Sequence, residues 1–102
     1  MDLLVSNHHL KLVGITPSKT PGKKWSAEFE IDGKIRKVVC FGDAGTQDFT
    51  ESQDHAKKEE MLESFKGTVS KPMSEDALVR WILWNKPCFQ KAVLDFKRRF
   101  HV

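Results

Sequence analysis

Alternation of apolar and polar side chains is clearest over residues 25–31, where every second side chain is apolar and the others are charged or hydroxylated. A period of two predicts a β-strand with one face buried. The dipeptide Asp32-Gly33 follows at once and is typical of a hairpin turn. With a short aliphatic segment at 10–15, the pattern predicts a three-stranded antiparallel sheet made of the hairpin 25–41 and the strand 10–15.

The register of this hairpin is predicted by pairing like side chains across the two strands. A three-residue loop over 31–33, with a left-handed glycine, sets Phe29 opposite Ile35. A two-residue loop would set Phe29 opposite Arg36 instead. We therefore expect the three-residue loop.

Three helices are predicted after the sheet, over about 54–66, 75–85 and 88–100, from apolar residues at helical spacing and from the breakers between them. Ser74 is the predicted N-cap of the second helix, because two acids follow it in the first turn, where the helix dipole favours negative charge. Strands followed by helices are typical of the α+β class. We therefore expect one α+β domain spanning residues 1–102.

The second and third predicted helices differ in their apolar faces. Apolar side chains surround almost the whole second helix, so it is either central in the core or lends one face, with Trp81 and Trp84, to a protein partner. Burial in the core is the simpler interpretation of these tryptophans. The third helix carries phenylalanines on one side and basic residues on the other, which predicts an anchored helix with a cationic face.

Composition narrows the function less than the pattern does. The 102 residues carry 17 Lys and Arg against 14 Asp and Glu, and a formal net charge of +3 is too small by itself to indicate a nucleic-acid partner. Cys40 and Cys88 belong to no Cys-x-x-Cys pair, so both are expected to be reduced, buried thiols. We expect an intracellular protein, because neither a signal peptide nor a membrane-spanning stretch is apparent.

The distribution of the positive charge is more informative than its sum. Five basic residues and one acid lie between Trp81 and the last residue. Lys and Arg contact phosphates, so a nucleic-acid footprint would combine a basic loop, the outer face of the hairpin and the third helix. A solvated face of mixed charge is the alternative, because Glu28 and Glu30 alternate with the strand cations. The candidate nucleic-acid-binding residues are Lys19, Lys23, Lys24, Lys34, Arg36, Lys91, Lys97, Arg98 and Arg99.

The segment Gly42–Thr50 holds two glycines and two acids ahead of the first predicted helix. Such a loop can present backbone N–H groups to a phosphate, or gather carboxylates around a divalent metal. A structural turn, in which Asp48 caps the following backbone and Phe49 enters the core, is the preferred interpretation. The histidines are scattered and no nucleophile motif is present, so we predict no catalytic residue, metal ligand or cofactor.

Two segments carry a resemblance to a known family: Phe41-Gly42-x-x-Gly45-x-x-Asp48-Phe49-Thr50 and Leu83-Trp84-Asn85-Lys86-Pro87. In this order they resemble a family of small uncharacterised proteins encoded by large DNA viruses of algae and protists. The likeness extends over most of the chain, including its last helix. It implies a viral or virus-derived origin, in the host cell or the virion, and no established activity.

These observations lead to three functional expectations. The first is a non-enzymatic viral accessory or virion-associated protein that binds nucleic acid through the basic loop and the C-terminal helix. The second is a structural or interaction module, either a homodimer or a minor virion component that contacts another viral protein, using apolar surface on residues 77–84. The third is a small metal-dependent enzyme at the loop 42–54.

Overall fold

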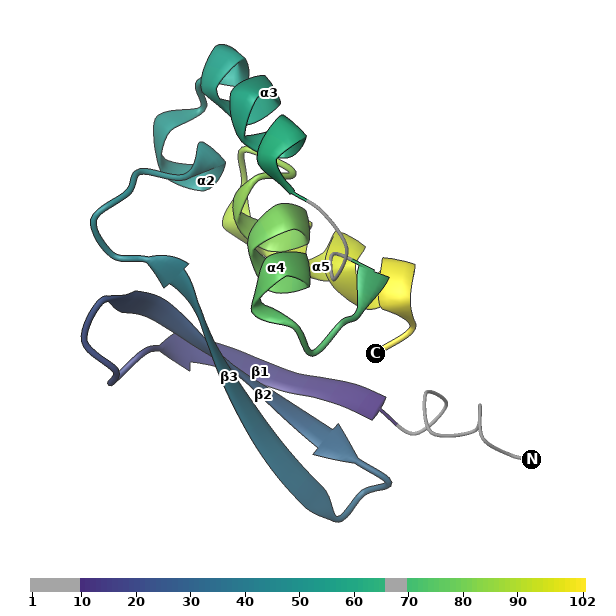
Figure 1. Ribbon diagram of the computed structural model, residues 1–102. Helices are drawn as coiled ribbons and strands as arrows, with labels where there is room; N and C mark the ends of the chain where they lie inside the picture. The colour runs from purple at the N-terminus through teal and green to yellow at the C-terminus, as the bar shows by residue number, and fades with distance from the viewer. Residues whose placement is uncertain (1–9, 66–69) are drawn as a thin grey trace.

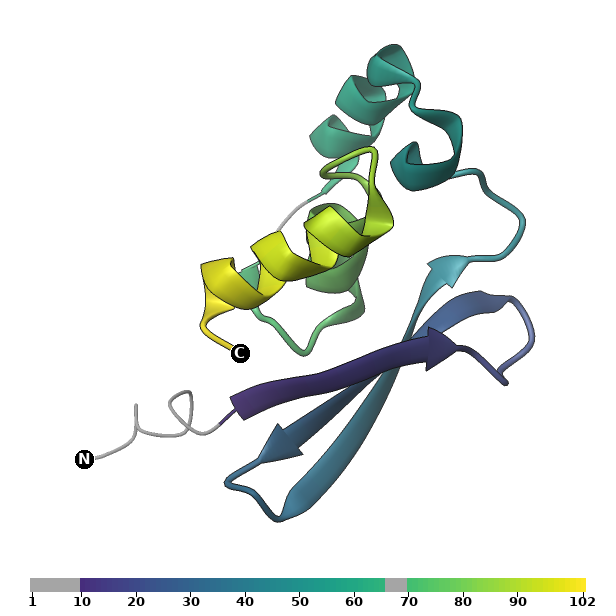
Figure 2. The ribbon, with the colours of Figure 1, turned by 180° about the vertical axis from the view of Figure 1, so that it is seen from behind.

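Three antiparallel strands form one sheet in a computed structural model that describes residues 10–65 and 70–102. The strands are β1 (Leu10–Pro17), β2 (Lys23–Ile31) and β3 (Ile35–Asp43), with β2 in the middle. The helices lie together on one face of the sheet and leave the other face open, as two opposite views show (Figure 1, Figure 2). The predicted α+β architecture, an antiparallel three-stranded sheet followed by helices, is confirmed.

The helical layer consists of short segments: α2 (Phe49–Ser52), α3 (His55–Ser64), α4 (Glu75–Leu78), the π-helical turn η2 (Val79–Leu83) and α5 (Phe89–Phe100). The helix predicted at about 54–66 is preceded by the extra turn α2, because Gln53 adopts a left-handed φ of 56° between α2 and α3. Its predicted end at residue 66 lies outside the described residues. In the part of the chain that is described, every helix is too short or too polar to cross a bilayer.

Ser74 is confirmed as the N-cap of α4, since its hydroxyl oxygen accepts a hydrogen bond from the Ala77 N–H at 3.1 Å. The helix predicted over 75–85 continues from α4 into η2, where the Trp84 N–H donates to the Val79 carbonyl at 3.0 Å. This bond spans five residues and widens the turn. Side chains in η2 are therefore rotated away from the positions that a regular α-helix would give them.

The predicted hairpin register is wrong by two residues. Phe29 pairs with Lys37, and Ile35 pairs with Ile31. A shift of two keeps each side chain on its predicted face, and Phe29 is fully buried as expected. Ile35 is 60% exposed. The predicted pairing with Phe29 is therefore not favoured by burial of the Ile35 side chain.

The turn between β2 and β3 explains the observed register. Asp32 and Gly33 both have positive φ, 56° and 71°, and the Lys34 N–H donates to the Ile31 carbonyl at 3.1 Å. Two consecutive left-handed residues are typical of the tight turns that match strand twist. Lys34 is therefore the last loop residue, and pairing resumes after it.

The core lies between the inner face of the sheet and the helices. Ala27 and Phe29 of β2 point inward and are fully buried. α5 lies along this face, and Phe89 at its start stacks on Trp25 with ring centroids 4.7 Å apart. Other core side chains, each 2% exposed or less, are Leu12, Phe41, Phe49, Ala77, Leu78, Ile82, Leu83, Trp84, Ala92 and Phe96. The predicted burial of the two cysteines is wrong, since Cys40 is half-buried and Cys88 is exposed.

Candidate functional site

The outward face of α5 brings two of the predicted cations together. Ala92 and Phe96 are fully buried on the side that faces the core. Lys91 and Arg98, seven residues apart, fall on the opposite side and are exposed, with Leu94 at 61% exposure between them. Within residues 10–65 and 70–102, no carboxylate pairs with Lys91 or Arg98. A helix anchored by its apolar side thus presents two unneutralised cations to solvent.

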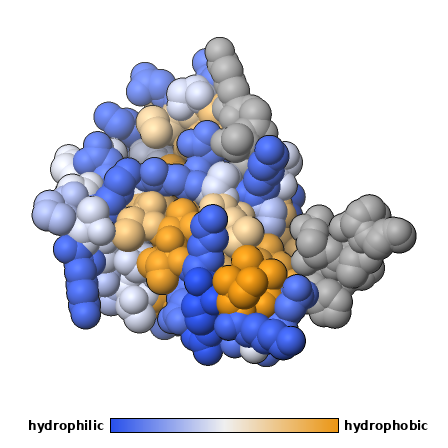
Figure 3. Space-filling view, turned by 60° about the horizontal axis from the view of Figure 1, so that its bottom comes forward, coloured by the Kyte–Doolittle hydropathy of each residue, from blue (hydrophilic) through white to orange (hydrophobic). Residues whose placement is uncertain are grey.

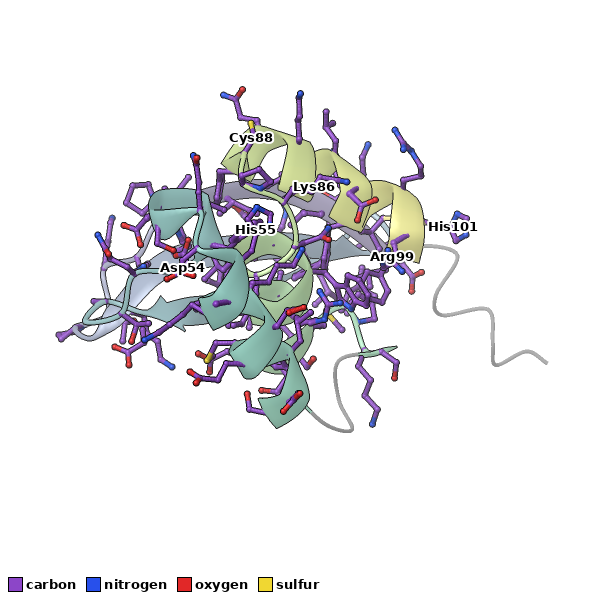
Figure 4. The ribbon with its side chains drawn as sticks, turned by 90° about the horizontal axis from the view of Figure 1, so that it is seen from above. Asp54, His55, Lys86, Cys88, Arg99 and His101 are labelled. Atoms are coloured by element: carbon purple, nitrogen blue, oxygen red, sulfur yellow. The ribbon has the colours of Figure 1, made fainter. Side chains whose placement is uncertain are left out.

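Lys97 and Arg99 lie on the two edges of α5 and not beside Arg98. Consecutive helical residues are about 100° apart, so residues two apart point in nearly opposite directions. Lys97 is half-buried on one edge, and Arg99 extends toward η2 from the other. Figure 4 shows Cys88 at the start of α5, with Arg99 and His101 toward its end. The three consecutive cations therefore do not share one surface.

Arg99 meets a second arginine at Trp81. The guanidinium carbon of Arg99 lies 3.7 Å from the centroid of the Trp81 ring, and that of Arg80 lies 3.9 Å from it. Two planar groups at these distances cannot occupy one face of a ring without overlap, so they lie on opposite faces of the indole. We call this arrangement the arginine sandwich (Arg80, Trp81 and Arg99). Cation–π contacts fix both guanidinium groups against the ring.

The charges around the arginine sandwich are unbalanced. Asp95 lies 3.7 Å from Arg99 but also accepts a hydrogen bond from the Asn85 amide at 2.7 Å. Nη1 of Arg80 is out of contact with solvent and has no hydrogen-bond partner. The pKa of Arg80 is lowered below its ordinary value. Burial is the larger cause, and the positive charge of Arg99 is the smaller one. Among the described residues, Asp95 is paired with Arg99, and no carboxylate is paired with Arg80.

Sequence reasoning missed the role of Arg80. The residue interrupts an apolar stretch, and an arginine inside an otherwise apolar helix is the signal that marks it. Its proximity to Arg99, nineteen positions along the chain, follows only from the packing of η2 on α5.

The other predicted cations lie at the two ends of the sheet. Lys34 is in the hairpin turn, and Arg36 is paired with Glu28 at 2.5 Å and Glu30 at 3.2 Å on the open face. Lys19, Lys23 and Lys24 lie near the other end of β2, whose nine residues span about 30 Å. The open face is also opposite the helical layer, so these residues and the outward face of α5 do not form one surface.

Lys24 belongs to an internal ion cluster. Its side chain is 14% exposed and donates to Asp48 at 2.8 Å and to Glu51. Asp48 caps α2 by accepting a hydrogen bond from the Thr50 N–H at 3.0 Å, and Glu51 accepts one from the Asp48 N–H at 3.2 Å. Phe49, between the two acids, is 1% exposed. The predicted cap at Asp48 and the predicted burial of Phe49 are confirmed.

The ion cluster shifts two titrations. Burial by itself would lower the pKa of Lys24, but its hydrogen bonds to Asp48 and Glu51 together outweigh burial and raise that pKa above 10.5. The hydrogen bond from Lys24, followed by that from the Asp48 backbone, lowers the pKa of Glu51 below 4.5. Lys24 is therefore engaged inside the molecule and is not available to a ligand.

Replacing Glu51 should change how stability responds to acid. Because the pKa of Glu51 is lower in the folded state, its contribution is complete above about pH 4.5 and is lost as the pH falls through the folded value. We expect the free energies of unfolding of wild type and Glu51→Gln to differ near neutral pH and to converge in acid, measured by urea denaturation at a series of pH values. The control variant Glu60→Gln, at an exposed position on α3, should not show this pH-dependent difference from wild type in its free energy of unfolding. Parallel curves for Glu51→Gln and wild type would contradict the assignment.

A hollow of about 450 Å³ opens between the start of β2, the segment 42–48 and α4. Its lining includes Lys23, which is paired with Glu75 at 2.5 Å, as well as Lys24 and Asp48. Each lysine is thus neutralised by a carboxylate nearby. Among the described residues, no group of three or more His, Cys, Asp or Glu side chains is arranged to hold a metal ion.

The apolar segment 77–84 is largely buried. Trp84 is 2% exposed, and Ala77, Leu78, Ile82 and Leu83 are 1% exposed or less. Of the two predicted interface residues, only Trp81 is partly accessible, and it lies within the arginine sandwich. The apolar surface expected on this segment for a protein partner is therefore mostly inside the core.

The two segments that carry the family resemblance touch each other. A side-chain Cβ built at Gly42 would lie 2.9 Å from Cδ1 of Leu83. Asp48 and Phe49 of the first segment form the cap and part of the core, and Trp84 of the second is also in the core. The shared residues therefore maintain the fold and lie apart from the outward face of α5.

Comparison with known proteins identifies a family for the N-terminal half. Residues 13–63, half of the chain, match a family described as "Family of unknown function (DUF5754)". The match covers most of the sheet, the segment 42–50, α2 and nearly all of α3, and it ends before α4. No curated protein and no solved structure matches the chain. The chain belongs to the DUF5754 family, whose function is unknown.

Proposed function

We propose that this protein is a non-enzymatic nucleic-acid-binding protein, a viral accessory or virion-associated factor that contacts phosphates through the outward face of α5. The observation that carries the proposal is the pair Lys91 and Arg98, exposed and without an ion-pair partner in the described chain. Phosphate neutralisation by such cations dominates affinity for nucleic acid. The viral part of the proposal rests on the resemblance of the segments 41–50 and 83–87.

The geometry favours α5 over the cations of the sheet. Arg36 and Lys23 are held by carboxylates, and Lys24 is enclosed in the ion cluster. A phosphate would have to displace these acids before it could bind there. α5 presents its cations on a rigid element instead, since its opposite side is packed on the core.

Removal of the two outward cations should weaken nucleic-acid binding and reduce its dependence on salt. For the double variant Lys91→Gln and Arg98→Gln we expect at least about a tenfold loss of affinity for duplex DNA, and a slope of log K against log salt that is smaller by about two. Electrophoretic mobility of DNA and RNA at several salt concentrations measures both quantities.

A matched double variant controls for net charge. Lys57→Gln and Lys71→Gln remove two exposed lysines outside α5 and should leave the affinity within about twofold of wild type. Wild-type binding that is insensitive to salt, or equal losses in the two double variants, would contradict binding through α5.

The open face of the sheet supports a second candidate function, self-association. Val38 is 58% and Val13 44% exposed, and both flank Glu28 on this face. Figure 3, which brings the underside of Figure 1 forward, shows apolar side chains divided and bordered by charged ones. A face with exposed apolar side chains and charges of both signs can pair with a second copy of itself. A mass that rises with concentration, and that Val38→Lys abolishes, would support this function, while a monomer at all concentrations would exclude it.

A further inference from the structure

The arginine sandwich holds two guanidinium groups at a fixed separation. Their carbons lie 3.7 and 3.9 Å from the ring centroid of Trp81, so they are at most about 7.6 Å apart. A tetrahedral oxyanion at the edge of the indole can accept one charge-assisted hydrogen bond of about 2.8 Å from each side, and it would span a gap of this size. Guanidinium groups also match phosphate oxygens in geometry.

Among the described residues, one carboxylate is paired with the two arginines of the sandwich. Nη1 of Arg80 has no hydrogen-bond partner among the described residues, and a guanidinium nitrogen that is shielded from water in this state is costly. Asp95 is the carboxylate beside Arg99, at 3.7 Å, and it also serves Asn85. A turn of the Arg80 guanidinium in its own plane, which keeps its contact with Trp81, would point Nη1 toward an incoming anion, and the bound anion would reduce the repulsion between the two arginines. A dianion would neutralise both.

We propose that the arginine sandwich binds a phosphate group that carries two negative charges. A terminal phosphate of a nucleic acid fits this description, because a phosphate monoester carries about −1.5 to −2 charges at neutral pH, whereas an internal diester carries one. A free phosphate compound offers the same chemistry. Only the nucleic-acid source of this phosphate group rests on the proposed function. The arginine sandwich lies beside the outward face of α5 and does not include Lys91 or Arg98.

The first test uses inorganic pyrophosphate as the probe. We expect it to raise the Tm of the whole protein by about 7 °C relative to sodium chloride at equal ionic strength, the shift given by a ligand near tenfold above its Kd. Arg99→Gln, a substitution at a half-exposed position, should abolish this rise, and Arg80→Lys should reduce it because the planar fork is lost. Lys57→Gln should keep the full rise.

The second test compares two oligonucleotides that differ only in a 5′-phosphate. Wild type should bind the phosphorylated strand at least about fivefold more tightly, and Arg99→Gln should remove that preference while binding of the 5′-hydroxyl strand changes by less than about twofold. A rise in Tm without this preference assigns the site to a free phosphate compound and still supports the inference.

Two outcomes overturn the inference. One is a Tm shift by pyrophosphate no larger than that of sodium chloride, and the other is a shift that persists unchanged in both Arg99→Gln and Arg80→Lys. Salt-dependent binding through Lys91 and Arg98 would survive either outcome, so the failure of this site and the failure of the proposed function are distinguishable.

Discussion

Lys24→Ala should lower the free energy of unfolding by about 3 kcal/mol, because it leaves the Asp48 carboxylate, 3% exposed, without its cation. Asp48 cannot turn to water, since its other oxygen caps α2 through the Thr50 N–H at 3.0 Å. A buried charge that loses its partner keeps its full desolvation cost. Urea denaturation monitored by tryptophan fluorescence measures the loss.

The adjacent residue provides the matched control. Lys23 is paired with Glu75, but the two side chains are 37% and 41% exposed, so Lys23→Ala should cost less than about 1 kcal/mol. The double variant Lys24→Ala with Asp48→Asn should recover part of the loss, because asparagine keeps a cap and removes the orphan charge. Equal costs for Lys23→Ala and Lys24→Ala would show that the ion cluster is not buried as described.

Gly42→Ala should destabilise the protein by about 3 kcal/mol, because two separate penalties act at this position. Its φ of +89° is unfavourable for any residue with a Cβ, and the added Cβ would lie 2.9 Å from Leu83 Cδ1 and 3.3 Å from Lys24 Cβ. The strand and η2 approach each other closely here, so neither neighbour can move freely. Thermal and urea unfolding of the variant measure the sum of the two penalties.

Gly22→Ala separates the two penalties. Gly22 has a nearly equal φ of +86° but no atom within 4 Å of the added Cβ, so only the backbone cost of about 1–2 kcal/mol should remain. The difference between the two alanine variants then reports the contact with Leu83. A Gly42→Ala variant as stable as Gly22→Ala would contradict the close approach of β3 and η2.

Local signals in the sequence predicted the elements well. The alternation over 25–31 and the capping pattern at Ser74 depend on neighbours a few residues away, which is why a single sequence contains them. The hairpin register depends on more, namely on how far the helical layer covers β3. Ile35 lies beyond this cover, and its apolar character was therefore misleading.

The candidate site was also hard to predict, because it depends on how distant segments of the chain pack together. Lys23 and Lys24 are adjacent and identical in sequence, yet Lys24 is enclosed by two acids and Lys23 has a single half-exposed partner. The arginine sandwich depends on the wide turn of η2, which rotates side chains away from regular helical positions. The positions of these side chains in the folded protein cannot be predicted from the pattern of residues along the chain.

The order of the elements also governs how this protein is made. The three strands are synthesised before the helices, and each pairs with its neighbour in sequence across a short loop, so the sheet can form early. The side chains that cover its inner face come largely from residues 75–100. Until α5 leaves the ribosome, Phe29 and its neighbours stay in contact with water between two unpaired strand edges. This interval during translation is the time at which the chain is most prone to aggregate.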